Sequence, residues 1–391
     1  MQRVYLDHNA TTPVRTEART AMVAAMDLIG NPSSVHAEGR SAKGAVERAR
    51  SQVANLVGCT PAQVVFTGSA TEAAALAVAQ KDQHGGIFAA LPTEHDCLTV
   101  WSEATLPALH DAKGRLSGQG GGEFLNWIAS RSSILDPNSN GPAALVAMSA
   151  ANSETGILPL GGQVVPNGYV NTAQAGPYSV VCDITQIAGK RPVVYDGDHR
   201  PAYMILSAHK LGGPKGVGAL INFTADDPRA ILRGGGQEMG RRSGTENIIG
   251  IVGFGAAAQA AQADLSNGRW EEIEELRIIL ENTLAADAKT TIFVGKDATR
   301  LPNTMCIATP GWKGEAQVIQ MDLAGFAISA GSACSSGKVK ASTVLRAMGY
   351  DEETASCAIR VSLGLDTTER DIQRFAETWL EKEKKFRARA A

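Results

Sequence analysis

The sequence lacks the features that mark several large classes of protein. Its six cysteines include no CxxC pair and its seven histidines show no HxxxH or HExxH spacing, so we expect neither a disulfide framework nor a metal site. No apolar run reaches the ~18 residues of a membrane span, and the polar first residues lead us to expect no secretory signal. The 37 basic and 40 acidic residues nearly cancel, which argues against a nucleic-acid or membrane partner. We therefore expect a cytoplasmic chain with reduced thiols.

The chain of 391 residues is long enough for two domains. Short apolar runs alternate with helical segments from about residue 60 to 222, which predicts a mostly parallel, doubly wound α/β sheet. We expect this sheet in a large domain of residues 15–255. Residues 1–14 and 256–391 are expected to form a smaller α+β domain. Doubly wound sheets bind ligands at the carboxyl ends of their strands.

One lysine lies where such a ligand would bind. The apolar run 203–206 predicts a buried strand, and Ser207, His209 and Lys210 follow it on a glycine-rich turn. A free lysine has a pKa of about 10.4. Desolvation and neighbouring positive charge lower that pKa, as carbonyl chemistry requires. From this stretch alone, a surface lysine in a loop is equally consistent.

Three more strands are followed by polar groups. Thr71 lies in a glycine-containing turn between a strand and a helix, which suits a phosphate or a plain helix cap. His95 follows a strand, where it can stack on a planar ring or simply form hydrogen bonds. Asp183 ends a strand and needs a cation, unless it caps a helix. Together with Lys210 they match the phosphate, ring, ring cation and aldehyde of pyridoxal 5'-phosphate (PLP).

The C-terminal part contributes two reactive residues. Cys334 lies in a loop of small residues with lysines close behind, which favours a thiolate, although a bare surface thiol is the alternative. The other cysteines have apolar neighbours, which predicts inert side chains. Arg360 lies in an apolar strand and is expected to meet a carboxylate. Residues 234–245 predict a flexible basic loop, either a linker or part of an anionic site.

Together these residues resemble a cysteine desulfurase of the class V aminotransferase family, whose members are fold-type I PLP-dependent enzymes. The resemblance covers nearly the whole chain, from Tyr5-Leu6-Asp7 to Ser362-Leu363-Gly364. It implies conversion of L-cysteine to L-alanine, with sulfur transferred to a persulfide on Cys334 and then to acceptors. It also implies a homodimer and a sulfur-acceptor or scaffold protein.

The resemblance implies roles for individual residues. Lys210 would hold the cofactor as a Schiff base, and Arg360 would bind the substrate carboxylate near Asn152 and Ser153. The other implied cofactor contacts are Ala70, Thr71, Ser207 and His209 at the phosphate, His95 on the ring, Asp183 at the pyridinium, Gln186 at the phenolic oxygen, and Thr245 from the other protomer.

The sequence departs from the family at a few positions. Ser153 replaces an asparagine that contacts cofactor and substrate in the family, and Gly68-Ser69 replaces the usual Ser-Gly. Ile184 and Ile187 flank Gln186 where smaller residues are usual. Two other functions therefore stay open: another class V PLP enzyme, such as a selenocysteine lyase or aminotransferase, or a catalytically weakened paralogue acting as an interaction module.

Overall fold

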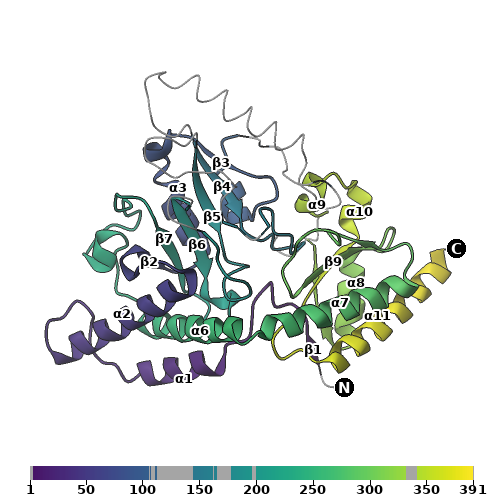
Figure 1. Ribbon diagram of the computed structural model, residues 1–391, viewed down its shortest axis with the longest axis horizontal. Helices are drawn as coiled ribbons and strands as arrows, with labels where there is room; N and C mark the ends of the chain where they lie inside the picture. Colours follow the sequence, from purple (N-terminus) through teal and green to yellow (C-terminus); the bar gives the residue numbers. More distant parts are fainter. Residues whose placement is uncertain are drawn as a thin grey trace.

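The computed structural model describes residues 3–104, 106, 111, 144–161, 163–164, 178–195, 200–331 and 341–390. Two parts lie side by side, and the consecutive helices α6 (Ile248–Ser266) and α7 (Arg269–Asp287) run along one edge of both (Figure 1). The larger part contains a six-stranded sheet and the smaller a four-stranded antiparallel sheet. This arrangement confirms a mostly parallel sheet accompanied by a smaller α/β unit. The domain boundaries at residues 14 and 255 stay a prediction.

The large sheet has the strand order β2-β7-β6-β5-β4-β3. Its strands are β2 (Val64–Thr67), β3 (Phe88–Ala90), β4 (Leu145–Ser149), β5 (Ser179–Asp183), β6 (Tyr203–Ser207) and β7 (Gly218–Asn222). The strands from β3 to β6 are parallel to one another, whereas β7 is antiparallel to both of its neighbours. The carboxyl ends of β3 to β6 therefore meet at one edge.

Helices cover both faces of this sheet, so its strand residues are buried. One face carries α1 (Thr16–Ala25), α2 (Ala37–Val57) and α6, and the other carries α3 (Ala70–Val78) and α4 (Asp96–Thr99). Along β4, Val146 and Met148 pack toward the first group, whereas Leu145 and Ala147 pack toward the second. Burial on both faces explains why the strands are continuous apolar runs in the sequence.

Helix α6 is long and apolar enough to cross a membrane, judged by length and composition. In the fold it is a core helix that packs against α1 and α2, with Phe254 and Ala257 fully buried. Gly255 lets it approach α2 closely, because a Cβ there would lie 2.6 Å from the Cα of Ala49. Its glycine- and alanine-rich composition therefore reflects close helix packing.

The smaller part is built around a sheet of order β11-β12-β9-β8. Its elements are β8 (Ile292–Phe293), β9 (Thr304–Ala308), α8 (Gly314–Leu323), β11 (Ser329–Ala330), α9 (Thr343–Ala347), α10 (Glu352–Ser356), β12 (Ala358–Ser362) and α11 (Glu369–Ala390). The N-terminal β1 (Val4–Tyr5) pairs in parallel with β10 (Phe326–Ala327). The start of the chain is thereby fixed beside its C-terminal part.

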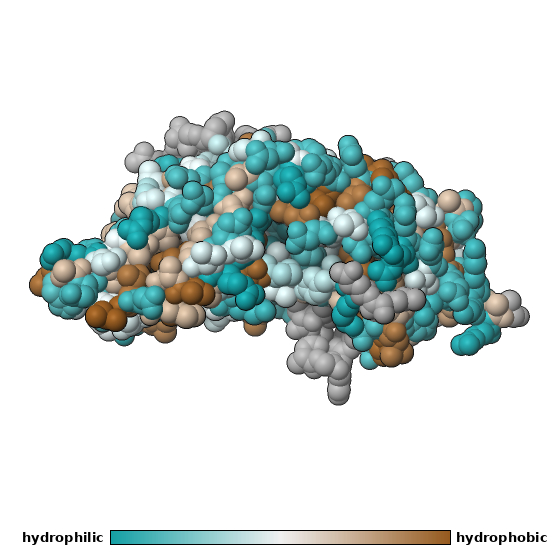
Figure 2. Space-filling model, turned by 90° about the horizontal axis from the view of Figure 1, so that it is seen from below, coloured by the Kyte–Doolittle hydropathy of each residue, from teal (hydrophilic) through white to brown (hydrophobic). Residues whose placement is uncertain are grey.

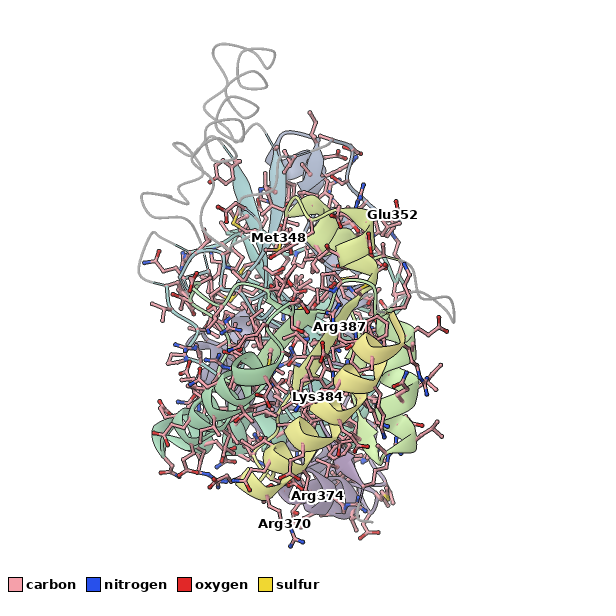
Figure 3. All side chains as sticks on the ribbon, turned by 90° about the vertical axis from the view of Figure 1, so that its right-hand side faces the viewer. Met348, Glu352, Arg370, Arg374, Lys384 and Arg387 are labelled. Carbon is pink, nitrogen blue, oxygen red and sulfur yellow. The ribbon has the colours of Figure 1, made fainter. Side chains whose placement is uncertain are left out.

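Helix α11 ends at Ala390. Its apolar face buries Phe375 and Trp379 in the core of the smaller part. Figure 3 shows α11 at the front, with Arg370, Arg374, Lys384 and Arg387 along it. Because Arg387 pairs with Glu383 and donates to the carbonyl of Pro310, the last turns are held by contacts that the sequence does not reveal.

The segment 234–245, predicted to be a flexible basic loop, is anchored at Glu238 by a buried ion pair. Glu238 accepts from Arg50 at 2.7 and 2.8 Å and from the backbone N–H of Phe66 at 2.9 Å. Glu238 (φ +50°) and Met239 (φ +59°) adopt the left-handed conformation, which costs energy for residues other than glycine. The ion pair stabilises that conformation against the chain's ordinary preference.

We predict that Glu238→Gln lowers the free energy of unfolding by about 3–5 kcal/mol, because it leaves the buried Arg50 cation with only the partly exposed Glu47 as a counter-charge. Glu47→Gln is the matched control: Glu47 also pairs with Arg50, but its side chain is 45% exposed, so its loss should cost less than about 1 kcal/mol. Urea unfolding of the three proteins measures both values. Equal losses would show that burial does not govern this ion pair.

Candidate active site

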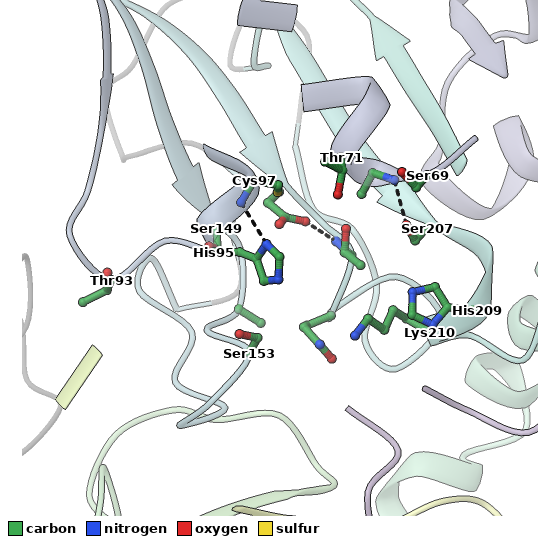
Figure 4. Close-up of a pocket in the computed structure, with 15 residues that line it drawn as sticks. Ser69, Thr71, Thr93, His95, Cys97, Ser149, Ser153, Ser207, His209 and Lys210 are labelled. Carbon is green, nitrogen blue, oxygen red and sulfur yellow. Dashed lines mark hydrogen bonds between the residues drawn. The ribbon is translucent and has the colours of Figure 1, made fainter. Parts of the chain in front are cut away.

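A pocket of about 220 Å³ lies at the carboxyl ends of the central strands (Figure 4). Most of the predicted site residues line it: Ala70, Thr71, His95, Ser153, Asp183, Gln186, Ser207, His209 and Lys210. Their side chains come from separate strands and from the loops after them, as expected for one edge of a doubly wound sheet.

The N-terminus of α3 forms one end of the pocket. Ser69 is its N-cap and accepts from the N–H of Glu72 at 3.3 Å, so Thr71 is not the cap. The hydroxyl of Ser207 accepts from the N–H of Ala70 at 2.7 Å, which joins the end of β6 to this helix. The N–H of Thr71 lies in the first turn of α3, where backbone N–H groups have no acceptor within the helix. With hydroxyls and the positive helix end beside it, this end of the pocket suits a phosphate.

Asp183 lies at the end of β5 and is buried. Its Oδ1 accepts from the backbone N–H of Thr185 at 2.8 Å, which orients the carboxylate at a turn and not at a helix cap. No hydrogen bond to the second oxygen, Oδ2, is found within the described parts of the chain, so it can pair with a cation in the pocket. A protonated ring nitrogen would meet that requirement.

His95 and Cys97 lie on another side of the pocket (Figure 4). His95 caps α4, and its Nδ1 accepts from the N–H of Cys97 at 3.1 Å. This bond fixes the ring beside the pocket, so both interpretations of His95 apply: it makes a local hydrogen bond and it can face a planar ligand. Burial raises the pKa of the Cys97 thiol, which makes it a poor nucleophile.

Lys210 follows β6 on a short turn and extends its amine into the pocket (Figure 4). Its Nζ donates to the backbone carbonyls of Asn9 at 2.6 Å and Ala10 at 2.9 Å. Beside it, burial and the charges of Lys210 and Lys215 lower the pKa of His209 to about 4. His209 is therefore neutral at neutral pH and contributes hydrogen bonds without adding charge.

Arg360 lies on β12, in the smaller part, and is buried. Its Nη2 contacts Oδ1 of Asp7 at 2.9 Å, and its Nη1 donates to the carbonyl of Ser153 at 3.0 Å. A carboxylate partner was expected, and Asp7 takes that place in the ligand-free chain. Because Ser153 also lines the pocket, the guanidinium lies at its border.

Asn152, Thr245 and Cys334 do not join this pocket in the part of the chain that is described. Asn152 is committed to its own loop: it donates to the carbonyl of Thr93 at 2.9 Å and accepts from two backbone N–H groups. Thr245 lines a separate hollow beside Arg242. Cys334 lies outside the described residues. The roles of all three stay predictions.

Four buried polar residues next to the pocket were missed. Asn9 and Lys190 lie behind Gln186: Lys190 donates to Asn9 Oδ1 at 3.2 Å and to Gln186 Oε1 at 3.0 Å. Glu94 accepts from the hydroxyl of Ser149, and burial raises its pKa to about 7. Glu154 lies next to Ser153. The two glutamates could have been found in the sequence, because Glu94 precedes His95 and Glu154 follows Ser153. Nothing in the sequence marks Asn9 or Lys190 as buried.

These residues fit PLP by the chemistry they offer. The pocket combines an anion-binding helix end at Thr71, the free carboxylate oxygen of Asp183, and the amine of Lys210. The absence of a side chain at Gly218 matters here, because a Cβ would lie 2.5 Å from the backbone carbon of Ser69. The phosphate turn can therefore pack directly onto β7.

Comparisons with known proteins agree with this geometry. Residues 4–375 match the family model described as Aminotransferase class-V. The chain is 37% identical to a cysteine desulfurase of Cereibacter sphaeroides, covering 96% of this chain and 95% of that protein. It is 37% identical to a cysteine desulfurase of Klebsiella pneumoniae, with coverages of 95% and 90%. A NifS-like protein from Rickettsia africae has a similar structure, with a TM-score of 0.81, 28% identity and coverages of 97% and 99%.

We predict that Glu154 makes stability depend on pH. It is buried, and its Oε1 has no hydrogen-bond partner among the described residues. Burial raises its pKa from 4.5 to about 7, against the smaller effects of Ser342 and Arg360. Because the pKa of Glu154 is higher in the folded than in the unfolded protein, its protonated form contributes to the free energy of unfolding. This contribution is complete below about pH 4.5 and is lost as pH rises through about 7.

Glu154→Gln should therefore be more stable than the wild type at pH 8 by about 1–3 kcal/mol, relative to the same comparison at pH 5. Thermal unfolding of both proteins at the two pH values measures this difference. A Tm difference that is the same at pH 5 and pH 8 would contradict the shifted pKa.

Proposed function

Because the chain belongs to the aminotransferase class-V family, we propose that it is a PLP-dependent cysteine desulfurase that converts L-cysteine to L-alanine and delivers sulfur to Cys334. The observation that carries the proposal is the single pocket in which Lys210, Asp183 and the α3 N-terminus converge. The full-length similarity to cysteine desulfurases supports the choice of reaction.

In this proposal each part of the pocket has one task. Lys210 would hold the cofactor aldehyde, Asp183 would keep the ring nitrogen protonated, and His95 would pack on the ring. Thr71, Ser207 and His209 would bind the phosphate. The N–H of Ala70 would orient the Ser207 hydroxyl, and Gln186 would donate to the ring oxygen. Bound PLP supplies an electron sink for the bond changes at the substrate.

Arg360 is proposed to release Asp7 and to bind the substrate carboxylate in its place. The guanidinium is already oriented by the carbonyl of Ser153 at 3.0 Å, and its contact with Asp7 shows that it can hold a carboxylate. An arginine prepared in this way binds a carboxylate with little further ordering. Ser153 lies within reach of the same substrate group, so the departure from the family asparagine bears on substrate affinity.

We propose that the enzyme works as a homodimer in which Thr245 serves the pocket of a second copy. Thr245 does not line its own chain's pocket. Val23, Met26, Ile29 and Val35 are between 58% and 88% exposed, and Figure 2 shows apolar surface at the end of the molecule where α1 and the following loop lie. An apolar surface of this kind suits burial against a partner.

The test of the proposed function is spectroscopic and chemical. The purified protein should bind PLP with a visible absorption band, which borohydride or Lys210→Ala abolishes. It should release alanine from L-cysteine, and with an added thiol that reduces the persulfide it should also release sulfide. Assays with L-selenocysteine and with a keto-acid acceptor separate the lyase and aminotransferase alternatives. A wild-type protein that cannot be loaded with PLP would contradict the proposal and leave the interaction-module alternative.

A second prediction separates Cys334 from Cys97, which lines the pocket and is 7% exposed. Cys334→Ala should keep the visible band but lose nearly all sulfide release and carry no persulfide. Cys97→Ala should retain activity, because burial keeps that thiol protonated. Alkylation and peptide mass analysis after exposure to cysteine locate the extra sulfur. Persulfide on Cys97 would overturn the assignment.

A further inference from the structure

Lys190 is a buried cation behind the floor of the pocket. It is 2% exposed, and its Nζ donates to Asn9 Oδ1 at 3.2 Å and to Gln186 Oε1 at 3.0 Å. Within the described ranges of the chain, no carboxylate forms an ion pair with it. A buried ammonium held only by neutral amides is costly for the fold, so its presence beside the pocket calls for a functional explanation.

Burial and two neighbouring positive charges act on Lys190. Burial lowers its pKa from 10.5 to about 7, and the charges of Lys210 and Arg360 act in the same direction. Its charge in turn contributes to lowering the pKa of His8 to about 4, although burial is the larger cause. On its other side lies a second cavity, whose charged and titratable lining also includes Arg15, Glu17, Asp264, Arg269 and Asp366.

Lys190 determines which way two neighbouring amides point. An ammonium can only donate hydrogen bonds, so the amide oxygens of Gln186 and Asn9 must both face it. The nitrogen of Gln186 then donates to the carbonyl of Asn9 at 3.0 Å, and its second N–H is left for the pocket that Gln186 lines. If Lys190 were apolar, only the carbonyl of Asn9 would orient the Gln186 amide.

The carbonyl of Asn9 connects Lys190 to Lys210. It accepts from the nitrogen of Gln186 and from the amine of Lys210, while the Asn9 side chain accepts from Lys190. A single residue therefore links the buried cation to the reactive amine, and the position of one amine is transmitted to the other through Asn9.

We propose that Lys190 is a positioning residue of the reaction, which presents a Gln186 N–H to the ring oxygen of the cofactor and holds a second positive charge behind Lys210. This inference rests on the proposed PLP-dependent function. A positive charge nearby disfavours a proton on the nitrogen that Lys210 contributes. While Lys190 is charged, it thus favours the less protonated form of that nitrogen.

The test is the pH titration of the visible band of the PLP-loaded protein. Lys190→Met has a similar length and no charge, and it should still fold, because removing a buried unpaired cation relieves a cost. It should bind PLP and raise the pH midpoint of the spectral change by about one unit. A merely structural role would change Tm and leave the midpoint in place.

A second variant offsets the charge of Lys190 without removing its side chain. Asn9→Asp leaves Lys190 in position and gives its ammonium a carboxylate partner, so it should also raise the midpoint. The control is Lys215→Met, which removes an exposed cation near His209 and should move the midpoint by less than about 0.2 units, because solvent screens exposed charges.

The outcomes distinguish the two proposals. A midpoint that rises in Lys190→Met and Asn9→Asp but not in Lys215→Met supports the role of Lys190. Visible bands with unchanged midpoints in both variants, or an equal shift in Lys215→Met, would overturn it while leaving the proposed function intact. A wild-type protein without any visible band would overturn the proposed function and this inference together.

Discussion

The candidate site depends on the burial of one residue from the N-terminal turn, Asn9. It is 1% exposed, and its backbone carbonyl accepts from Lys210 and Gln186. Its side chain accepts from Lys190 and donates to Thr304 Oγ1 at 2.9 Å. Because a buried amide must satisfy its donors and acceptors, these bonds fix the turn, and the turn fixes the position of the reactive amine.

The same residue ties the two parts of the molecule together. Its backbone N–H donates to Ser362 Oγ on β12 at 3.0 Å, and its side chain donates to the carbonyl of Ser153 at 3.3 Å. β12 also carries Arg360, which contacts the same Ser153 carbonyl. The proposed substrate arginine and the cofactor lysine are therefore positioned by one connected set of hydrogen bonds, although they come from different sheets.

Two buried basic side chains contribute to the electrostatics of the site. Lys190 and Arg360 are nearly inaccessible to water, and the nearest carboxylate to Arg360 is Asp7 at 2.9 Å. Such a site favours anionic ligands, as both a phosphate and an amino-acid carboxylate are. Replacing Asp7 by a substrate carboxylate would keep the charge balance, so binding need not leave Arg360 without a partner.

The sequence by itself determined the strands, the order of the elements and most of the pocket. Because both faces of β4 and β5 are buried, these strands are continuous apolar runs in the sequence. The polar residues at their ends, Asp183 among them, lie together because the carboxyl ends of parallel strands share one edge of the sheet. The antiparallel β7 could not be read in this way, since strand direction leaves no mark on composition. The same holds for Glu238, whose burial depends on Arg50 far away in the chain.

Only the tertiary structure decided which polar residues became buried and paired. Asn9 and Lys190 are ordinary turn and loop residues in the sequence, and their neighbours Lys210 and Thr304 are distant along the chain. The local pattern of apolar and polar residues predicts which side of a segment is buried. It does not predict which distant donor a buried amide contacts, because that depends on how the two sheets pack around the N-terminal turn.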